Sequence, residues 1–221
     1  MIGRARCVAA LYEEAFMTEA SLKHAAKAAR IADQEWPEGT KPVVTIRCTT
    51  YNHVRFIGKC VEGFLMQETT FPVEIVFHDD ASTDGTQEFI QQLLERFPPL
   101  IKAILQPKNL RPRGLRRGEF LAPMLRGDYI AFCEGDDYWT DPEKLQKQVD
   151  FLEANPEYVL RRHDIFEVDE HDTVLRESAL SRDRRRDHRR DELIRPEAWL
   201  GARYVHRAPR PHRSSRFQKP S

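Results

Sequence analysis

The chain has 221 residues, and its 35 basic and 35 acidic side chains cancel to a formal net charge of zero. This length suffices for one sizeable core, alone or with an appendage, and the balanced charge gives no general reason to expect nucleic acid or acidic partners. No apolar run approaches the roughly 20 residues of a membrane-spanning helix, and the N-terminus lacks the continuous apolar stretch of a secretory signal. We therefore expect a soluble protein.

The first 40 residues are rich in Ala, Glu and Lys, which predicts a helical N-terminal extension that ends before Pro37. We expect it to pack on the domain; the alternative, a helix on a membrane surface, has only a weak apolar face to support it. The apolar residues at helical spacing are Leu11, Ala15, Leu22, Ala26 and Ala29.

Residues 41–175 alternate strand and helix signals, which predicts a mostly parallel α/β sheet flanked by helices. Capping residues predict where the helices begin: Asn52, Asp84 with Gln87 as its capping-box partner, and Asp141 before Pro142. Strands are expected at residues 43–49, 73–79, 101–106 and 129–134.

The four cysteines, Cys7, Cys48, Cys60 and Cys133, do not have the spacing of a metal site. Two lie in predicted strands and one on an apolar helix face, so we expect small core residues in a reducing compartment, the cytoplasm. Residues 176–221 differ from the rest of the chain: a charge run and a basic, Pro-rich stretch predict an irregular, disordered tail.

Polar clusters follow three of the predicted strands: "TTYNH" the first, "DDASTDGT" the second and "EGDDYW" the fourth. In an open parallel sheet, ligands bind beyond the carboxyl ends of the strands. If the first and fourth strands are neighbours, all three clusters meet over one crevice.

Glu134, Asp136 and Asp137 crowd three carboxylates directly after a predicted buried strand. Mg²⁺ or Mn²⁺ would relieve their repulsion and neutralise a bound diphosphate. The alternative is a solvated acidic loop with Asp136 capping a turn, but the strand before it and the Asp-Pro helix start after it favour a metal site.

Weaker signals lie nearby. Asp80 offers a carboxylate to the N–H of a pyrimidine base, or caps a turn. Tyr51 would stack on a base in a nucleotide site; the alternative is a tyrosine at the edge of the core. Arg113, Arg116 and Arg117 close over phosphates, or form a solvated basic loop.

The stretches "VVTIRCTTYNHVRFIGKCVEGFLMQ", "VEIVFHDDASTDGTQEFI" and "GDYIAFCEGDDYWTDPEKLQKQVDFLEANPEY" together resemble a family 2 glycosyltransferase with the GT-A fold, over about residues 41–160. The resemblance implies a Rossmann-like sheet with strand order 3-2-1-4 around a nucleotide. It also implies transfer of a sugar from a nucleoside diphosphate donor, often UDP, with inversion and with help from Mg²⁺ or Mn²⁺. The implied acceptor is a saccharide or a lipid-linked saccharide in bacterial polysaccharide biosynthesis, with peripheral association at the inner face of the membrane and no specific nucleic acid.

Residue by residue, the resemblance implies a nucleoside pocket lined by Thr49 and Tyr51, with Asp80 on the base and Arg117 approaching the nucleotide. Asp136 would lie against the ribose and diphosphate. Asp136 and Asp137 would hold the metal, and Glu134 stands where many relatives have the first Asp of a D-x-D motif, so the pair of acids that binds metal stays open.

The resemblance weakens downstream, where the family carries an Asp general base that deprotonates the acceptor. Asp164, Asp169, Glu170 and Asp172 are candidates, but none matches the family motif, so the catalytic residue is left unassigned. We therefore expect an incomplete, donor-binding form with a truncated or frame-disrupted end.

Two other functions compete with a glycosyltransferase. A metal-dependent nucleotidyltransferase uses similar acids, but "TTYNH" lacks the Gly-rich phosphate loop it needs. A dinucleotide oxidoreductase is disfavoured because no G-x-G-x-x-G follows a strand. The non-enzymatic alternative is a basic-tail interaction protein that binds RNA or anionic lipid through charge alone.

Overall fold

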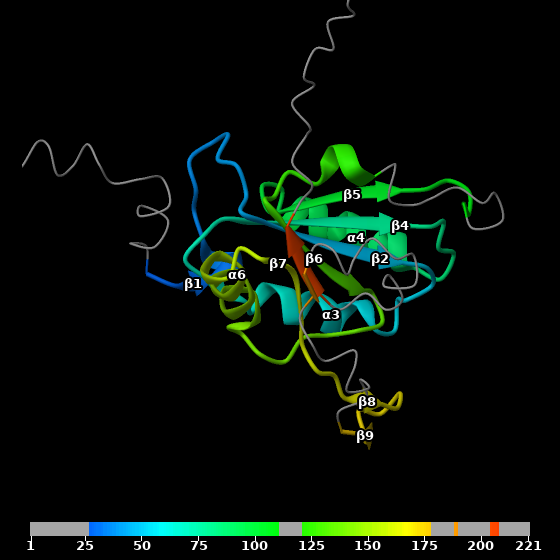
Figure 1. Ribbon diagram of the computed structural model, residues 1–221. Helices are drawn as coiled ribbons and strands as arrows, with labels where there is room; N and C mark the ends of the chain where they lie inside the picture. The colour runs from blue at the N-terminus through cyan, green and yellow to red at the C-terminus, as the bar shows by residue number, and fades with distance from the viewer. Residues whose placement is uncertain (1–26, 111–120, 178–187, 190–203, 208–221) are drawn as a thin grey trace, which may run out of the picture.

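The computed structural model describes residues 27–110, 121–177, 188–189 and 204–207. Its centre is a sheet of seven strands, ordered β10-β7-β11-β6-β2-β4-β5 (Figure 1). Their bounds are β2 (Val44–Thr50), β4 (Val73–Asp79), β5 (Ile101–Leu105), β6 (Tyr129–Glu134), β7 (Tyr158–Arg162), β10 (His188–Arg189) and β11 (Tyr204–Arg207).

Four of these strands form a parallel sheet in the predicted order. β2 pairs with β4 on one side and with β6 on the other, and β4 pairs with β5, which is the order 3-2-1-4. The predicted bounds of β4 and β6 are confirmed. Those of β2 differ by one residue at both ends, and those of β5 by one residue at the C-terminal end. The α/β fold class is therefore confirmed.

Three helices cover one face of this sheet: α3 (Ile57–Leu65), α4 (Thr86–Arg96) and α6 (Lys144–Ala154). Their apolar stripes join alternate residues of β2, β4 and β6 in one buried cluster, as the two-residue period of strands requires. Phe64 of α3 and Trp139, just before α6, meet edge to face with ring centroids 4.8 Å apart. The helices thus pack against the strands whose ends carry the polar loops.

Two predicted helix caps are wrong. Asn52 does not cap α3; it adopts a left-handed conformation (φ 55°), and its Oδ1 accepts the N–H of Thr83 at 2.9 Å. Gln87 does not close a capping box with Asp84, because its amide donates to Asp79 Oδ1 and to the Gln106 carbonyl. Both side chains tie neighbouring loops together, which a local capping pattern does not reveal.

Asp84 and Asp141 lie just before their helices, although the N-cap residues are Gly85 and Glu143, and each accepts a backbone N–H near the helix start. Asp84 Oδ1 accepts the N–H of Thr86 at 3.1 Å, and Asp141 Oδ1 accepts the N–H of Glu143 at 3.0 Å. Although burial acts to raise it, hydrogen bonds from Thr86 and from the N–H of Val54 lower the pKa of the Asp84 carboxyl. Both helices start within three residues of the predicted point.

The described part of the N-terminal extension is not an α-helix. β1 (Ala29–Arg30) pairs with β3 (Glu68–Thr69), and the 3₁₀ turn η1 (Ile31–Asp33) follows. Residues 1–26 lie outside the described part of the chain, so the helical extension stays a prediction there.

Two strands come from the region predicted to be an irregular tail. β11 lies between β6 and β7, antiparallel to both, and β10 pairs with β7. The prediction is corrected at these six residues, because strand pairing uses backbone groups and needs no long apolar pattern. The other residues beyond 177 lie outside the described part.

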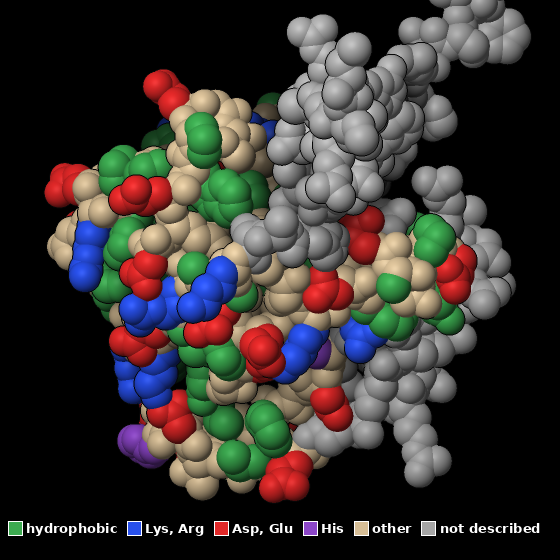
Figure 2. All heavy atoms as spheres, turned by 90° about the vertical axis from the view of Figure 1, so that its left-hand side faces the viewer, with side chains coloured by type: hydrophobic (Ala, Val, Ile, Leu, Met, Phe, Trp, Pro, Cys, Tyr) green, Lys and Arg blue, Asp and Glu red, His purple; other side chains and the backbone are tan. Residues whose placement is uncertain are grey.

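A small hairpin, β8 (Glu167–Val168) with β9 (Val174–Arg176), projects away from the main sheet at the bottom of Figure 1. A 3₁₀ turn, η3 (Ala122–Met124), precedes β6. On the face drawn in Figure 2, acidic and basic side chains are interspersed rather than gathered in one patch. No helix among the described residues is long and apolar enough to cross a membrane.

Candidate functional site

The polar loops after β2, β4 and β6 meet at one edge of the sheet. Thr49 of β2 lies beside Glu134 of β6 in register, and the Asp80 N–H donates to the Thr50 carbonyl at 3.0 Å. The expectation that the first and fourth strands are neighbours is therefore confirmed, and so is the meeting of the three clusters.

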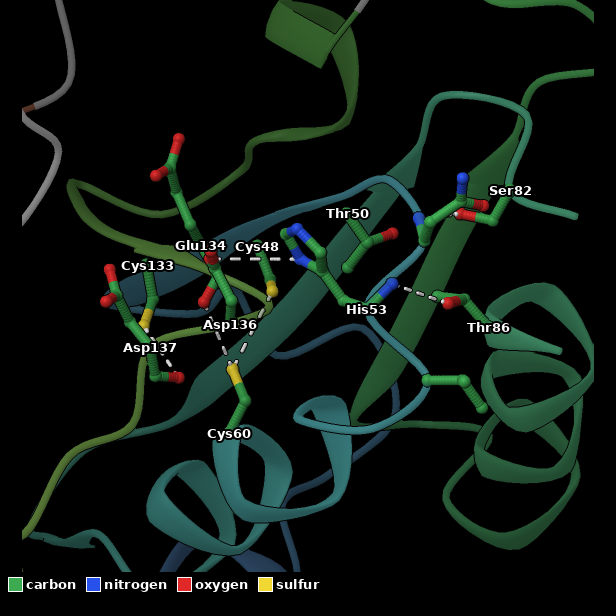
Figure 3. Close-up of polar contacts among 12 residues, drawn as sticks. Cys48, Thr50, His53, Cys60, Ser82, Thr86, Cys133, Glu134, Asp136 and Asp137 are labelled. Atoms are coloured by element: carbon green, nitrogen blue, oxygen red, sulfur yellow. Dashed lines mark hydrogen bonds and ion pairs between the residues drawn. The ribbon is translucent and has the colours of Figure 1, made fainter. Parts of the chain in front are cut away.

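Glu134, Asp136 and Asp137 form a compact acidic trio at the end of β6 (Figure 3). One carboxylate oxygen from each lies within 4.8 Å of the others; Glu134 and Asp136 are exposed, and Asp137 is half-buried. The Asp137 N–H donates to the Glu134 carbonyl at 3.0 Å, which closes the turn that brings the acids together. Hard oxygen ligands at this spacing suit Mg²⁺ or Mn²⁺.

Gly135, between the acids, is required by a close approach of two loops. Its N–H donates to the Thr49 carbonyl at 2.9 Å. A Cβ at this position would lie 2.5 Å from Thr50 Cγ2 and 3.0 Å from His53 Nδ1. Any side chain here would push the β2 loop away from the acidic trio.

His53 is a site residue that sequence reasoning missed. Its Nδ1 lies 3.8 Å from Asp136 Oδ1 (Figure 3). The backbone N–H of His53 donates to Thr86 Oγ1 at 2.9 Å, and the backbone N–H of Val54 donates to Asp84 Oδ2 at 3.0 Å. The start of α4 thus fixes the loop that carries His53 against the acids.

The predicted nucleoside residues lie at the same edge in different environments. Thr49 is half-buried, while Tyr51 is 44% exposed. Asp80 is 1% exposed, and its Oδ1 accepts the N–H of Leu110 at 2.7 Å. Asp79 rather than Asp80 holds the turn, because it accepts the N–H of Ser82 at 2.8 Å. Arg113, Arg116 and Arg117 lie outside the described residues.

Three thiols lie directly beneath the trio. Cys48 Sγ and Cys60 Sγ are 3.9 Å apart, Cys60 donates to the Glu134 carbonyl at 3.5 Å, and Cys133 donates to the Asp137 carbonyl at 3.8 Å (Figure 3). Burial raises the pKa of Cys48 and Cys60, and the hydrogen bond with Cys60 together with burial raises that of Cys133. All three are buried and free, which confirms them as core residues.

A cavity of about 820 Å³ opens beside the trio, between the loop after β6, the start of α6 and the β8–β9 hairpin. Asp136 and Asp137 line it, together with two of the four candidate bases, Asp164 and Asp172. Asp172 forms an ion pair with Lys59 and accepts the Tyr138 hydroxyl at 3.2 Å.

The other two candidate bases are engaged outside the cavity lining. Asp169 accepts the N–H groups of His171 and Thr173, which stabilises the hairpin turn and lowers its pKa. Glu170 pairs with Arg55 at 3.1 Å. Neither belongs to the cavity lining.

Lys144 and Trp139 also line this cavity, and both were missed from the sequence. Lys144 is 6% exposed and Trp139 5% exposed. A lysine at the first residue of a helix is ordinarily solvated, so no sequence signal indicated its burial.

Comparison with known proteins gives a family match. The model described as Glycosyl transferase family 2 matches residues 45–207. The chain is 41% identical over 122 residues to the uncharacterized protein Rv1520 of Mycobacterium tuberculosis (strain ATCC 25618 / H37Rv), covering 55% of this chain and 35% of that protein. It is 33% identical over 113 residues to the Escherichia coli UDP-Glc:alpha-D-GlcNAc-diphosphoundecaprenol beta-1,3-glucosyltransferase WfaP, covering 51% and 42%. The aligned part spans less than half the length of either relative.

Solved structures are also similar over part of the chain. The S. aureus TarS 1-349 structure has a TM-score of 0.49 at 18% identity, covering 74% of this chain and 46% of that one. The mannosyltransferase PcManGT from Pyrobaculum calidifontis, in complex with GDP-Man and Mn2+, has a TM-score of 0.47 at 22% identity, covering 62% and 40%.

Proposed function

We propose that this chain, which belongs to glycosyl transferase family 2, binds a nucleoside diphosphate sugar at the carboxyl ends of β2, β4 and β6 and transfers the sugar to a saccharide or lipid-linked acceptor. The observation that carries the proposal is the acidic trio, whose oxygens lie within 4.8 Å of one another beside the loop after β2. UDP is the favoured nucleotide, because a relative 33% identical over 113 residues is named for a UDP-glucose donor.

Asp136 and Asp137 would hold the Mg²⁺ or Mn²⁺, with Glu134 as a third oxygen ligand. The fit is reasonable, because opposite ligands of an octahedral Mg²⁺ at about 2.1 Å lie about 4.2 Å apart, close to the spread of the trio. The ion would supply charge neutralisation for the leaving diphosphate. Asp136, turned toward His53, would also lie against the ribose and diphosphate.

Thr49 and Tyr51 would line the nucleoside pocket, and the exposed ring of Tyr51 is free to stack on a base. Asp80 would accept the base N–H, and the Leu110 N–H bond at 2.7 Å would hold its carboxylate in place. Arg117 would approach the nucleotide from the loop before β6.

Asp164 is the better candidate for the general base that an inverting reaction needs. It lines the cavity beside Asp136 and Asp137. Asp172 lines it too, but its ion pair with Lys59 stabilises the carboxylate and makes it a weaker proton acceptor. The buried free thiols favour a reducing compartment, so we place the reaction in the cytoplasm, with a lipid-linked acceptor at the inner face of the membrane.

Thermal unfolding with UDP, GDP and CDP, each with Mn²⁺ or with chelator, tests donor binding. UDP with Mn²⁺ at 100 times its dissociation constant should add about 2.7 kcal/mol of stability. Equal shifts with Mn²⁺ and with chelator would refute the metal role, and no shift with any nucleotide would refute donor binding. Labelled transfer from UDP-sugars to a membrane extract then tests the reaction itself.

A further inference from the structure

Lys144 is a buried lysine without a carboxylate partner among the described residues. Its Nζ donates to the neutral Gln148 Oε1 at 2.8 Å and lies 3.8 Å from the centroid of the Trp139 ring. Lys147, one turn nearer the middle of the same helix, is exposed and pairs with Asp141 and Glu143. Asp141 and Glu143 therefore form ion pairs with the exposed Lys147 and not with the buried Lys144.

Burial of the Lys144 ammonium group is electrostatically unfavourable when no ligand is bound. A buried ammonium ion loses hydration that one neutral acceptor and one aromatic face do not replace. Lys144 is also the first residue of α6, where the helix dipole is positive. Burial lowers its pKa to about 7, although Cys133 of β6 and Asp141 act to raise it. His163 and Asp164 line the same cavity from the segment after β7.

Trp139 adds a second donor in need of an acceptor. Its ring is buried, and its indole N–H has no hydrogen-bond partner within the described part of the chain. A buried donor without an acceptor destabilises the fold. Because Trp139 and Lys144 line one cavity and contact each other, an oxygen-rich group bound at Lys144 would lie beside the Trp139 ring.

We propose that this cavity binds an anionic group, a carboxylate or a phosphate, of the saccharide acceptor, and that Lys144 is the residue that selects it. The inference rests on the proposed function and names the acceptor class. The cavity contains Asp164 but none of Thr49, Tyr51 and Asp80, so it lies on the acceptor side of the trio.

The charges around the cavity explain why an anion is selected and how it is oriented. The other charged lining residues are mostly carboxylates, among them Asp136, Asp137 and Asp164. They repel an anion except near the two cations of the lining, Lys144 and Arg176, of which Arg176 already pairs with Glu167 at 3.6 Å. The carboxylates also accept hydrogen bonds from sugar hydroxyls. An acceptor with its anion at Lys144 therefore places hydroxyl groups toward Asp164.

Calorimetric titration of the full chain, saturated with UDP and Mn²⁺, tests the proposal with three probes: glucuronic acid, glucose 1-phosphate and the neutral methyl glucoside. We expect at least one anionic probe to bind tenfold or more tighter than methyl glucoside. Glucuronic acid alone would identify a carboxylate, and glucose 1-phosphate alone a phosphate. Lys144→Met should remove the preference, while the matched control Lys147→Met should keep it.

Proton uptake gives a readout that a merely structural lysine would not change. A bound anion raises the pKa of Lys144, so at pH 8 binding should take up protons, measured in buffers of different ionisation enthalpy. The uptake should persist in Lys147→Met and vanish in Lys144→Met. If Lys144→Met fails to fold, the unmodified chain still tests the inference, because an absence of proton uptake there would contradict it.

Three results would overturn the inference: no anion preference in the unmodified chain, an unchanged preference in Lys144→Met, or an equal loss of UDP affinity in that variant. The last would assign Lys144 to the nucleotide. Failure of the unmodified chain to bind UDP at all would instead refute the proposed function.

Discussion

Asp137 is the most enclosed member of the acidic trio, and its position gives the clearest test of a metal site. Asp137→Asn keeps the shape and removes the charge, so it should weaken Mn²⁺-dependent UDP binding about tenfold or more, or about 1.4 kcal/mol. The matched control is Asp128→Asn, an exposed acid that pairs with Lys41 just before β6. Titration of UDP with Mn²⁺ and with chelator measures the effect; an equal loss in both would contradict metal ligation.

Gly135 tests the close approach that holds the trio together. In Gly135→Ala the new Cβ would lie 2.5 Å from Thr50 Cγ2 and 3.0 Å from His53 Nδ1, so we expect about 1–3 kcal/mol of destabilisation from overpacking. Gly58→Ala in α3 is the control, since its Cβ would meet nothing within 4 Å and should stabilise the helix by up to about 1 kcal/mol. Urea unfolding compares the two; a neutral Gly135→Ala would show that the loops move apart freely.

The residues predicted from sequence are those whose signal is local. Glu134 ends the strand β6, and Asp136 and Asp137 follow it directly, so the sequence predicts that the three acids cluster. His53 reaches Asp136 across the sheet edge, and the burial of Lys144 depends on Trp139 and Gln148 packing around it. Such contacts are set by tertiary packing, which no spacing rule encodes.

At the scale of elements, β-branched and apolar residues predicted the positions of β4 and β6 to the residue, because buried parallel strands are rich in such residues. Helix starts were less predictable. Asn52 and Gln87 have the residue types of caps, yet their side chains bind Thr83, Asp79 and Gln106 instead. Polar side chains near a strand end can form hydrogen bonds with several backbone groups, and tertiary packing determines which of these bonds forms.

Glu74 joins three strands and the segment before β6 through one buried carboxylate. It accepts hydrogen bonds from Thr45 of β2 and Lys102 of β5, at 2.7 and 2.8 Å, and from the N–H and Nε of Arg126. Although burial acts to raise it, the bonds from Lys102, Thr45 and the Arg126 N–H hold the pKa of Glu74 below its ordinary value.

A lowered pKa means that this carboxylate stabilises the fold above its ordinary pKa and loses that contribution as the pH falls through the folded value. Glu74→Gln should therefore cost about 3 kcal/mol at pH 7 and less as the solution is acidified. Urea unfolding between pH 3 and 7 measures this, with the exposed Glu62→Gln of α3 as control. Equal losses at pH 3 and 7 would contradict the assignment.

At the scale of the molecule, the least predictable feature is that residues far along the chain complete the main sheet. β11 inserts between β6 and β7, pairing residues 205–207 with 129–131 of β6 and residues 204–206 with 160–162 of β7. The surrounding sequence is basic and Pro-rich, so neither apolar periodicity nor turn signals indicate a strand. Backbone pairing to strands already in place provides the order that the local pattern lacks.

This arrangement predicts that residues up to 207 are needed for stability. A chain ending at residue 177 would leave β6 and β7 without the strand between them, next to the buried side chains of Ile130 and Leu160. At about 1 kcal/mol net for each backbone hydrogen bond lost, we expect at least about 3 kcal/mol of destabilisation and weaker UDP binding, because β6 carries the acidic trio. The comparison is a chain ending at residue 207, where the family match also ends, which keeps β11 and every other described residue. Urea unfolding of the three chains decides the question: if the chain ending at 177 is as stable as the full chain, β11 contributes nothing to the sheet.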